Sequence, residues 1–235
     1  MQFIASLIFT SFFLLFTFTY GIFFCVVSIL LPFRARFALA RAWAHVLLFA
    51  LKALCRLDYR VEGIENLPAE PSVALVKHSS TWETIAQAVL LPPQAWVLKR
   101  ELTWIPFVGW GIRLLRGIAI DRSAGGAAVR QMIEQGRERL KAGVWIVVFP
   151  EGTRMAPGET RRYGVGGAAV AADTGALVVP VAHNAGYFWT RRGLLKKPGT
   201  IRVVIGRPIV TQGRDAREIN EEAQRFIEAN SGPPR

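Results

Sequence analysis

Hydrophobic residues form one unbroken block at the start of the chain and short, separate runs after it. The first 33 residues contain no Asp, Glu, Lys or Arg, and residues 3–31 are rich in Phe, Leu and Ile. Because about 20 consecutive apolar residues are enough for a helix to cross a membrane, this block predicts a retained membrane helix. Two alternatives are a cleaved signal peptide, which has a basic start and a small-residue cleavage site, and a buried helix of a soluble protein.

A second apolar segment, residues 34–57, follows Pro32 and is interrupted by basic residues. It has no acidic residue, and its cations are Arg34, Arg36, Arg41, Lys52 and Arg56. This pattern predicts a second helix that is membrane-embedded, interfacial or packed on the rest of the protein. Because basic residues mark the cytoplasmic side of membrane helices, we expect the chain beyond Leu31 to be cytoplasmic. We therefore predict a membrane-embedded helical segment over residues 1–57 and one folded domain over residues 58–235.

Beyond residue 58, short β-rich runs alternate with segments of helical periodicity. We expect strands at residues 59–61, 72–76, 95–99, 118–120, 144–149, 176–181 and 200–205. We expect helices at residues 81–90, 124–141, 166–174 and 214–229. Several of the strands are continuous apolar runs, which is typical of a sheet covered on both faces. The alternation predicts a layered α/β domain with a largely parallel or mixed sheet flanked by helices.

The net charge of the chain indicates which classes of partner it is suited to bind. The chain of 235 residues has 29 basic and 17 acidic residues, which gives a net charge of +12. This excess favours polyanionic partners, namely nucleic acid, anionic lipid headgroups or phosphorylated substrates, and the hydrophobic start favours lipid. Two cysteines, Cys25 and Cys55, are too few for a disulfide framework or a zinc cluster.

A candidate base lies where a predicted strand gives way to a predicted helix. Residues 77–84 read K-H-S-S-T-W-E-T, so that His78 precedes Glu83 by five positions. Five positions are about 140° apart on a regular helix, and a contact therefore requires His78 to stand before the first turn, which the Ser-Ser-Thr run can cap. A carboxylate on one ring nitrogen fixes the tautomer and leaves the other nitrogen free to accept a proton. The plainer alternative is a surface histidine.

Cations follow other predicted strands. Residues 149–154 read F-P-E-G-T-R, in which Gly152 lets the backbone approach a ligand and Arg154 offers a donor fork suited to phosphate. Residues 117–122 read G-I-A-I-D-R, and Arg122 stands where an anion can meet a helix start. Lys99, in the L-K-R-E-L of residues 98–102, is a further cation at a strand end. The plainer alternatives are an exposed turn at Arg154, a helix cap at Asp121 and a solvated Lys99.

Together these segments resemble the glycerolipid acyltransferase family, specifically the 1-acylglycerol-3-phosphate O-acyltransferases. The first block of that family is H-x-x-x-x-D, which His78 to Glu83 matches with Glu in place of Asp. The second block is matched within residues 98–122, the third by F-P-E-G-T-R, and the fourth by the V-P-V of residues 179–181, which otherwise reads as a core strand. Short motifs match by chance when taken singly, but four in this order are specific.

The resemblance implies that His78 removes the proton of the sn-2 hydroxyl of lysophosphatidic acid. The alkoxide then attacks the thioester of acyl-CoA or acyl carrier protein, and the product is phosphatidic acid. The resemblance also implies membrane lipids as partners of the protein. It further implies that Glu83 orients His78 and that no metal or other cofactor takes part. The residues implied in binding the substrate are Lys99, Arg122, Glu151, Gly152, Thr153 and Arg154.

The sequence departs from the family pattern at two places. Glu83 is one methylene longer than Asp, so that it reaches His78 through an adjustment of the backbone or else only caps the helix. Gly164 stands where relatives often carry a basic residue, and the neighbouring Arg161 and Arg162 are candidates to compensate.

Two other functions fit parts of the sequence. The first is acyl transfer to a different lyso-lipid, such as an amino-acid-containing one. The second is a non-enzymatic, membrane-anchored nucleic-acid binder, which would explain the charge alone. The basic residues are scattered and are not interleaved with the stacking aromatics that single-strand binders use. We therefore expect no nucleic-acid partner.

Overall fold

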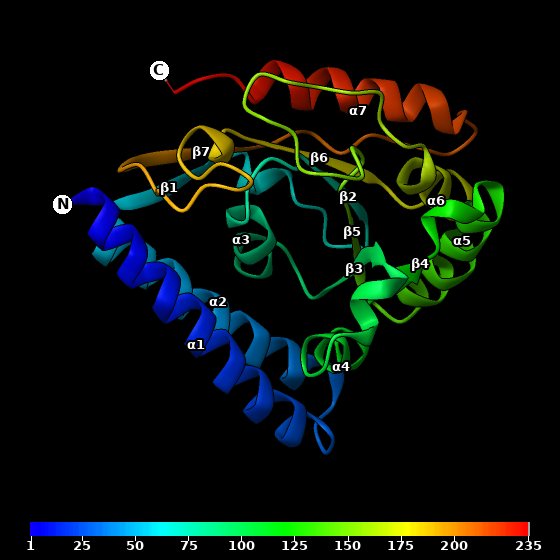
Figure 1. The fold of residues 1–235 in the computed structure, drawn as a ribbon. Coiled ribbons are helices and arrows are strands. Elements are labelled where there is room, and N and C mark those ends of the chain that lie inside the picture. The colour runs from blue at the N-terminus through cyan, green and yellow to red at the C-terminus, as the bar shows by residue number, and fades with distance from the viewer. Residues whose placement is uncertain (235) are drawn as a thin grey trace.

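Seven strands form one mixed sheet through the centre of the molecule (Figure 1). The computed structural model describes residues 1–234 and, among these, every side chain except that of Arg122. The strand order is β1-β7-β6-β2-β5-β3-β4, in which β6 and β7 are antiparallel and the other neighbours are parallel. The predicted α/β class is confirmed, and each predicted strand is present: β1 Leu57–Glu62, β2 Val73–Val76, β3 Gln94–Lys99, β4 Ile118–Ile120, β5 Trp145–Val148, β6 Val178–His183 and β7 Gly199–Ile205.

Helices cover both faces of this sheet. Side chains alternate between the two faces along a strand, so Leu75 of β2 packs with α5, α6 and α7, and the next residue, Val76, packs with α2 and α3. Figure 1 shows α7 on one side of the sheet and α1 to α3 on the other. The helices are α1 Gln2–Ser28, α2 Phe33–Cys55, α3 Trp82–Leu90, α4 Val108–Leu114, α5 Gly126–Lys141, α6 Gly166–Thr174 and α7 Ala216–Asn230.

The first two helices form a hairpin that lies beside the domain (Figure 1). Both are long and apolar enough to cross a membrane, which fits the predicted membrane association. The N-terminal half of α1 also packs on the domain, where the ring of Phe9 meets that of Trp189 edge-on at 5.7 Å between centroids. Arg41 of α2 donates to two backbone carbonyls at the end of α3. The hairpin therefore contacts the α/β domain and is also apolar enough to enter a membrane. The predicted division of the chain into two parts after residue 57 stays a prediction.

The structure corrects several predicted boundaries. The second helix ends at Cys55 and does not reach residue 57, because Arg56 is left-handed with φ 56° and the next residue already pairs with β7. Strand β6 extends to His183, beyond the predicted end at residue 181, because its last residues pair with β7. The helix α4 was not predicted. It is short and contains two glycines, and Gly109 is held directly against the backbone of Thr103.

Candidate active site

Three adjacent strands bring the candidate residues to one edge of the sheet. Strand β2 runs into Lys77 and His78, the neighbouring β5 runs into the F-P-E-G-T-R turn, and β6 on the other side of β2 ends at His183. These three strands are parallel to one another. Because the carboxyl ends of parallel strands share an edge, motifs far apart in the sequence become neighbours there.

His78 stands just before α3 and contacts Glu83 in the first turn of that helix. The Nδ1 atom of His78 lies 2.9 Å from Oε1 of Glu83. The backbone N–H groups of Ser79 and Ser80 donate to the same oxygen at 3.0 and 2.9 Å. Thr81 occupies the N-cap position but makes no side-chain cap. Glu83 therefore touches the ring and also holds the backbone of the turn that leads into α3, so the geometry agrees with the first of its two alternatives, contact with His78.

The carboxylate of Glu83 is ionised in spite of its burial. Burial raises the pKa of Glu83, but the nearby His183 ring, the hydrogen bond with His78 and the N–H of Ser80 lower it by more, so that the pKa lies below its ordinary value. An ionised carboxylate only accepts hydrogen bonds. His78 therefore donates from Nδ1 and keeps a lone pair on Nε2. Its side chain is 15% exposed, so a ligand can reach the ring.

A second histidine, His183, is buried behind Glu83. The backbone N–H of Ala185 donates to Nδ1 of His183 at 3.2 Å, so Nε2 carries the hydrogen and donates to the carbonyl of Lys77 at 2.8 Å. Burial lowers the pKa of His183, and the ring is therefore neutral near neutral pH. Its Nε2 lies 3.8 Å from Oε2 of Glu83, an oxygen that has no hydrogen-bond partner among the side chains and backbone that the structure describes. The ring of His183 thus lies beside the carboxylate, while its N–H is donated to the carbonyl of Lys77.

The turn after β5 wraps around His78. The ring of Phe149 stacks on the imidazole, with 4.2 Å between centroids and 21° between planes. Oε1 of Glu151 accepts the backbone N–H of His78 at 3.2 Å, and the N–H of Met155 donates to the carbonyl of His78 at 2.8 Å. Gly152 has φ 69°, which glycine adopts without steric penalty. The first and third motifs therefore form one structural unit.

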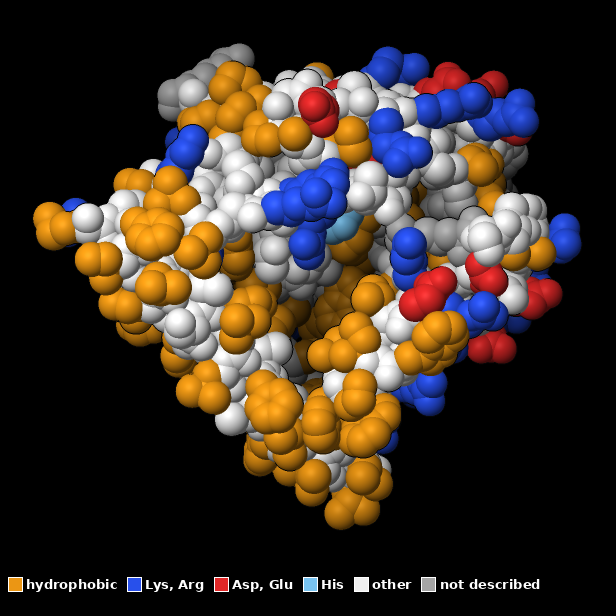
Figure 2. Space-filling model, viewed as in Figure 1, with side chains coloured by type: hydrophobic (Ala, Val, Ile, Leu, Met, Phe, Trp, Pro, Cys, Tyr) orange, Lys and Arg blue, Asp and Glu red, His pale blue; other side chains and the backbone are white. Residues whose placement is uncertain are grey.

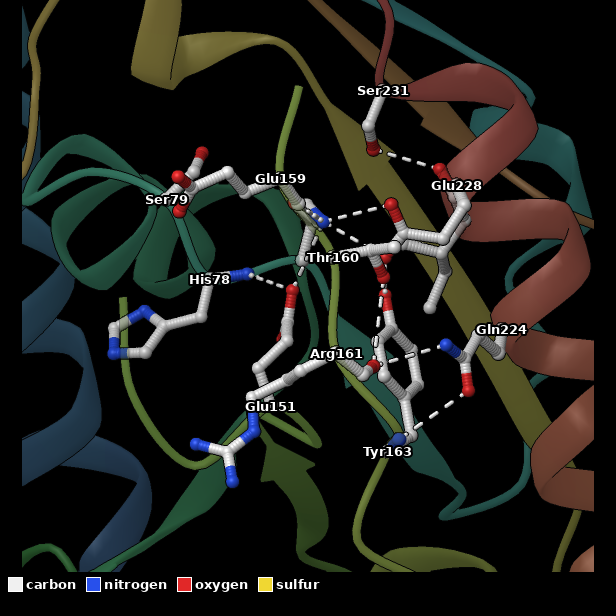
Figure 3. Close-up of polar contacts among 12 residues, drawn as sticks. His78, Ser79, Glu151, Glu159, Thr160, Arg161, Tyr163, Gln224, Glu228 and Ser231 are labelled. Carbon is white, nitrogen blue, oxygen red and sulfur yellow. Dashed lines mark hydrogen bonds and ion pairs between the residues drawn. The ribbon is translucent and has the colours of Figure 1, made fainter. Parts of the chain in front are cut away.

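Buried charges connect this unit to the C-terminal helix (Figure 3). Nζ of Lys77 donates to the two carboxylate oxygens of Glu228 at 2.8 and 2.9 Å and lies 3.3 Å from Oε1 of Glu151. The hydroxyl of Tyr163 donates to Oε1 of Glu228 at 2.6 Å. Because a buried ammonium depends on such partners, these contacts tie α7 to the residue that directly precedes His78.

Glu151 lies in this network and not at an open surface. Its carboxylate is buried and faces Lys77 and the backbone of His78. Burial raises the pKa of Glu151 to about 7, against the lowering effect of Lys77 and of the N–H of His78. The side chain of Glu151 is only 2% exposed, so it is not open to the phosphate of a substrate. The geometry therefore supports a role in positioning His78, which differs from the expected contact with substrate.

The predicted phosphate-binding cations lie at the ends of neighbouring strands. Lys99 is exposed at the end of β3, and Arg154 is half-buried and Thr153 exposed in the turn after β5. The carbonyl of Arg154 accepts Nη1 of Arg191 at 2.7 Å, whereas its own Nε has no hydrogen-bond partner among the residues that the structure describes. The guanidinium of Arg154 therefore has a buried donor that is unsatisfied among the described residues. The side chain of Arg122 lies outside the described part of the chain.

Two of the plainer alternatives are confirmed. Asp121 accepts the backbone N–H of Ser123 at 3.0 Å and so caps the short helical turn after β4. The V-P-V motif, residues 179–181, is buried in β6 and packs in the core. These residues shape the edge of the sheet on which the site lies.

Sequence reasoning missed Lys77, His183, Tyr163 and Glu228. The first two had a usable signal, since each is a polar residue at the end of an apolar strand, where parallel sheets place their sites. Glu228 had no local signal, because it meets Lys77 from 151 positions away. The helical pattern of residues 214–229 indicated only an ordinary amphipathic helix.

A family model described as Acyltransferase matches residues 58–184. This chain belongs to the acyltransferase family. The acyltransferase is 41% identical over 214 residues to a 1-acyl-sn-glycerol-3-phosphate acyltransferase of Pseudomonas aeruginosa, and this match covers 89% of the chain and 83% of that protein. A Saccharomyces cerevisiae protein of the same name is 31% identical, over 81% of the chain and 63% of that protein. The chain is 29% identical to the chloroplastic 1-acyl-sn-glycerol-3-phosphate acyltransferase LPAT1 of Arabidopsis thaliana. This match covers 88% of the chain and 63% of LPAT1.

The fold of this acyltransferase is also that of a solved relative. The 1-acyl-sn-glycerophosphate (LPA) acyltransferase PlsC from Thermotoga maritima superimposes with a TM-score of 0.80 and 25% sequence identity. The match covers 97% of this chain and 95% of the other. The superposition therefore includes the N-terminal hairpin as well as the sheet, and the two proteins share both parts of the architecture.

Proposed function

We propose that this acyltransferase moves the acyl group of acyl-CoA or an acyl carrier protein to the sn-2 hydroxyl of 1-acylglycerol-3-phosphate. The product is phosphatidic acid, an intermediate of phospholipid biosynthesis. The contact of 2.9 Å between His78 and Glu83 carries the proposal, because it leaves Nε2 of His78 as a base for a substrate hydroxyl. The activity for which the Pseudomonas and yeast relatives are named supports this acceptor.

The reaction needs one base and no enzyme nucleophile. Nε2 of His78 takes the proton of the hydroxyl while the hydroxyl oxygen attacks the thioester carbonyl carbon. The resulting tetrahedral intermediate expels the thiolate as the C–S bond breaks, and the thiolate takes the proton back from the imidazolium. Glu83 stabilises that imidazolium through Nδ1, and Phe149 keeps the plane of the ring fixed.

The phosphate of the acceptor would be held by Lys99, Arg122, Thr153 and Arg154, with the backbone at Gly152 close to it. Arginine suits this task because its planar fork matches phosphate oxygens. Holding hydroxyl and thioester together removes much of the entropic barrier, several kcal/mol in favourable cases. This scheme uses no cofactor. The absence of a metal requirement stays a prediction, and an activity assay in the presence of EDTA tests it.

The hairpin of α1 and α2 would hold the enzyme at the bilayer in which a one-tailed acceptor resides. We propose that the catalytic domain faces the cytoplasm, because the basic residues after Leu31 favour that side. The excess of cations over acids would attract anionic lipid, by about 1 kcal/mol for each cation near the surface. The same field would attract an acidic carrier protein.

A mass-spectrometric assay of the purified protein tests this function. Lysophosphatidic acid and amino-acid-containing lyso-lipids are offered with acyl-CoA and with acyl carrier protein, each with and without EDTA. We expect phosphatidic acid as the main product and no effect of EDTA. Transfer to another lyso-lipid but not to lysophosphatidic acid would contradict the acceptor and leave the acyltransferase chemistry intact.

A further inference from the structure

An apolar surface outside the hairpin projects from the 3₁₀ turn η2 (Arg100–Trp104) and from α4. Its most prominent members are two tryptophans, Trp104 at 65% and Trp110 at 50% exposure. We call it the 102–110 surface, after its exposed hydrophobic side chains Leu102, Trp104, Ile105, Val108 and Trp110. Contiguous exposed apolar side chains of this size mark a place of contact with a membrane or a partner.

The 102–110 surface is continuous with the apolar surface of α1. The ring of Phe107 packs edge-on against Phe18 of α1 at 5.8 Å and against Trp110 at 5.1 Å between centroids. Sγ of Cys25 donates to the carbonyl of Phe107 at 3.4 Å. Figure 2 shows hydrophobic side chains on both sides of a hollow between the hairpin and the region of α4, with Lys and Arg side chains above it. A bilayer that receives α1 therefore meets the 102–110 surface as well.

The backbone at the junction of the two surfaces supports this reading. Phe107 has φ 61° and ψ −50°, a positive-φ conformation that is unusual for a bulky residue. Such a conformation persists only where the surroundings hold it, and here its ring is held between α1 and Trp110. The chain thus accepts a strained turn that keeps the two apolar surfaces side by side.

The charges around the 102–110 surface favour an anionic partner. Residues 99–116 contain four cations and one acid, Glu101, and the exposed cations are Lys99, Arg100, Arg113 and Arg116. The guanidinium of Arg100 pairs with Asp121 at 3.1 Å and lies over the ring of Trp104, 6.0 Å from its centroid. Tryptophan beside basic residues is typical of the headgroup region of membranes, where one part of the side chain is apolar and the other is wet.

We propose that the 102–110 surface is a second membrane-contacting element, which inserts its side chains into the headgroup region of an anionic bilayer next to α1. This inference rests on the membrane association proposed above, but not on the identity of the acceptor. It would bring both sides of the hollow to the membrane, so that a lipid acceptor enters without crossing water. A second copy of the chain is the competing occupant.

Depth measurements on the full-length protein test the proposal without any need for turnover. In a chain with Cys25→Ala and Cys55→Ala, a single cysteine at Trp104, Trp110 or Val210 carries an environment-sensitive nitrobenzoxadiazole probe. Val210 is the matched control, because it is an exposed hydrophobic residue at 60% that precedes α7, away from α1 and α4. The protein is placed in vesicles of phosphatidylethanolamine and phosphatidylglycerol, with and without nitroxide-labelled lipid.

We expect probes at positions 104 and 110 to shift to the blue and to lose at least about half of their emission to the nitroxide lipid, as side chains at headgroup depth do, while the probe at position 210 stays unquenched. Probes at 104 and 110 that are as water-exposed as the one at 210 would overturn the proposal. So would shielding in detergent that increases with protein concentration, which would identify a second copy as the occupant.

A comparison of KM values for two forms of the acceptor tests the proposal independently. Trp104→Glu combined with Trp110→Glu should raise the KM for vesicle-bound acceptor roughly tenfold, as expected for loss of two buried apolar anchors, relative to the KM for a short-chain acceptor dissolved as monomers. Val210→Glu should leave that ratio unchanged. An unchanged ratio in the double variant would contradict the proposal, and a complete lack of transfer by the wild-type protein to both acceptors would instead contradict the proposed function.

Discussion

The ammonium of Lys77 donates to both carboxylate oxygens of Glu228, at 2.8 and 2.9 Å. Lys77 directly precedes His78, and Glu228 lies near the end of α7, so the last helix of the chain holds the segment that carries the candidate base. Tyr163 and Glu151 complete the network. The C-terminal helix therefore belongs to the support of the site and is more than a cover for the sheet.

The first prediction concerns this support. Glu228→Gln removes one charge and leaves buried Lys77 with Glu151 as its one carboxylate partner among the described residues, so we expect the free energy of unfolding to fall by about 1–3 kcal/mol. The value of kcat should fall as well, because the backbone at His78 loses its anchor, while the KM values change little. Glu221→Gln, at an exposed position of α7, is the matched control. Equal stability and kcat in the two variants would contradict this role.

The second prediction concerns the carboxylate on His78. Glu83→Gln keeps the shape of the side chain but removes the charge that stabilises the imidazolium, so kcat should fall on the order of 100-fold or more. Glu83→Asp should lose less, since it keeps the charge, but its shorter side chain cannot reach the ring and the two N–H groups of Ser79 and Ser80 together without a shift of α3. Steady-state kinetics of both variants test this, and wild-type rates in Glu83→Gln would refute it.

The third prediction concerns pH. Burial raises the pKa of Glu151 from 4.5 to about 7, so between these values the folded protein keeps a proton that the unfolded chain has lost. The contribution of Glu151 to stability is therefore full below the lower value and declines as pH rises through the upper one. Glu151→Gln never ionises, and its stability relative to wild type should rise by about 3 kcal/mol across this range.

Thermal unfolding in detergent at a series of pH values measures this difference. Glu159→Gln, an exposed residue of the same loop, is the control and should show no such trend. A difference between Glu151→Gln and wild type that does not change with pH would show that Glu151 ionises normally in the folded protein.

The fourth prediction concerns the phosphate site. Arg154→Ala should raise the KM for lysophosphatidic acid by about tenfold or more, as expected for loss of a charge-assisted hydrogen bond, with little change in the KM for the acyl donor. Arg207→Ala replaces an exposed arginine after β7 and serves as the control for net charge. If both variants show the same KM for the acceptor, Arg154 is not part of the phosphate site.

Much of the fold follows from local pattern. Strands β2 and β5 are buried on both faces, so they read as unbroken apolar runs in the sequence. The helix α4 escaped prediction because its formation depends on contacts distant in sequence, with Phe107 against α1 and Gly109 against Thr103. No periodicity over seven residues that include two glycines could indicate it.

The parts of the site that were predictable from the sequence are the residues that directly follow a strand. His78 and Glu83 are local in sequence, and the contact required His78 to stand before the helix, as it does. The burial of Glu151 and its pairing with Lys77 depend on how β2 and β5 lie next to each other. A carboxylate in a motif is equally consistent with an exposed and a buried position, so the sequence alone did not separate substrate contact from support.

The central claim is that the imidazole of His78 takes the proton of the acceptor hydroxyl. Single-turnover kinetics of His78→Ala with lysophosphatidic acid and acyl-CoA test it most directly, with His45→Ala on the exposed side of α2 as the control. The account predicts a loss of at least about 100-fold in the acyl-transfer rate for His78→Ala, with unchanged thermal unfolding, and a normal rate for His45→Ala. A rate for His78→Ala close to that of the control would contradict it.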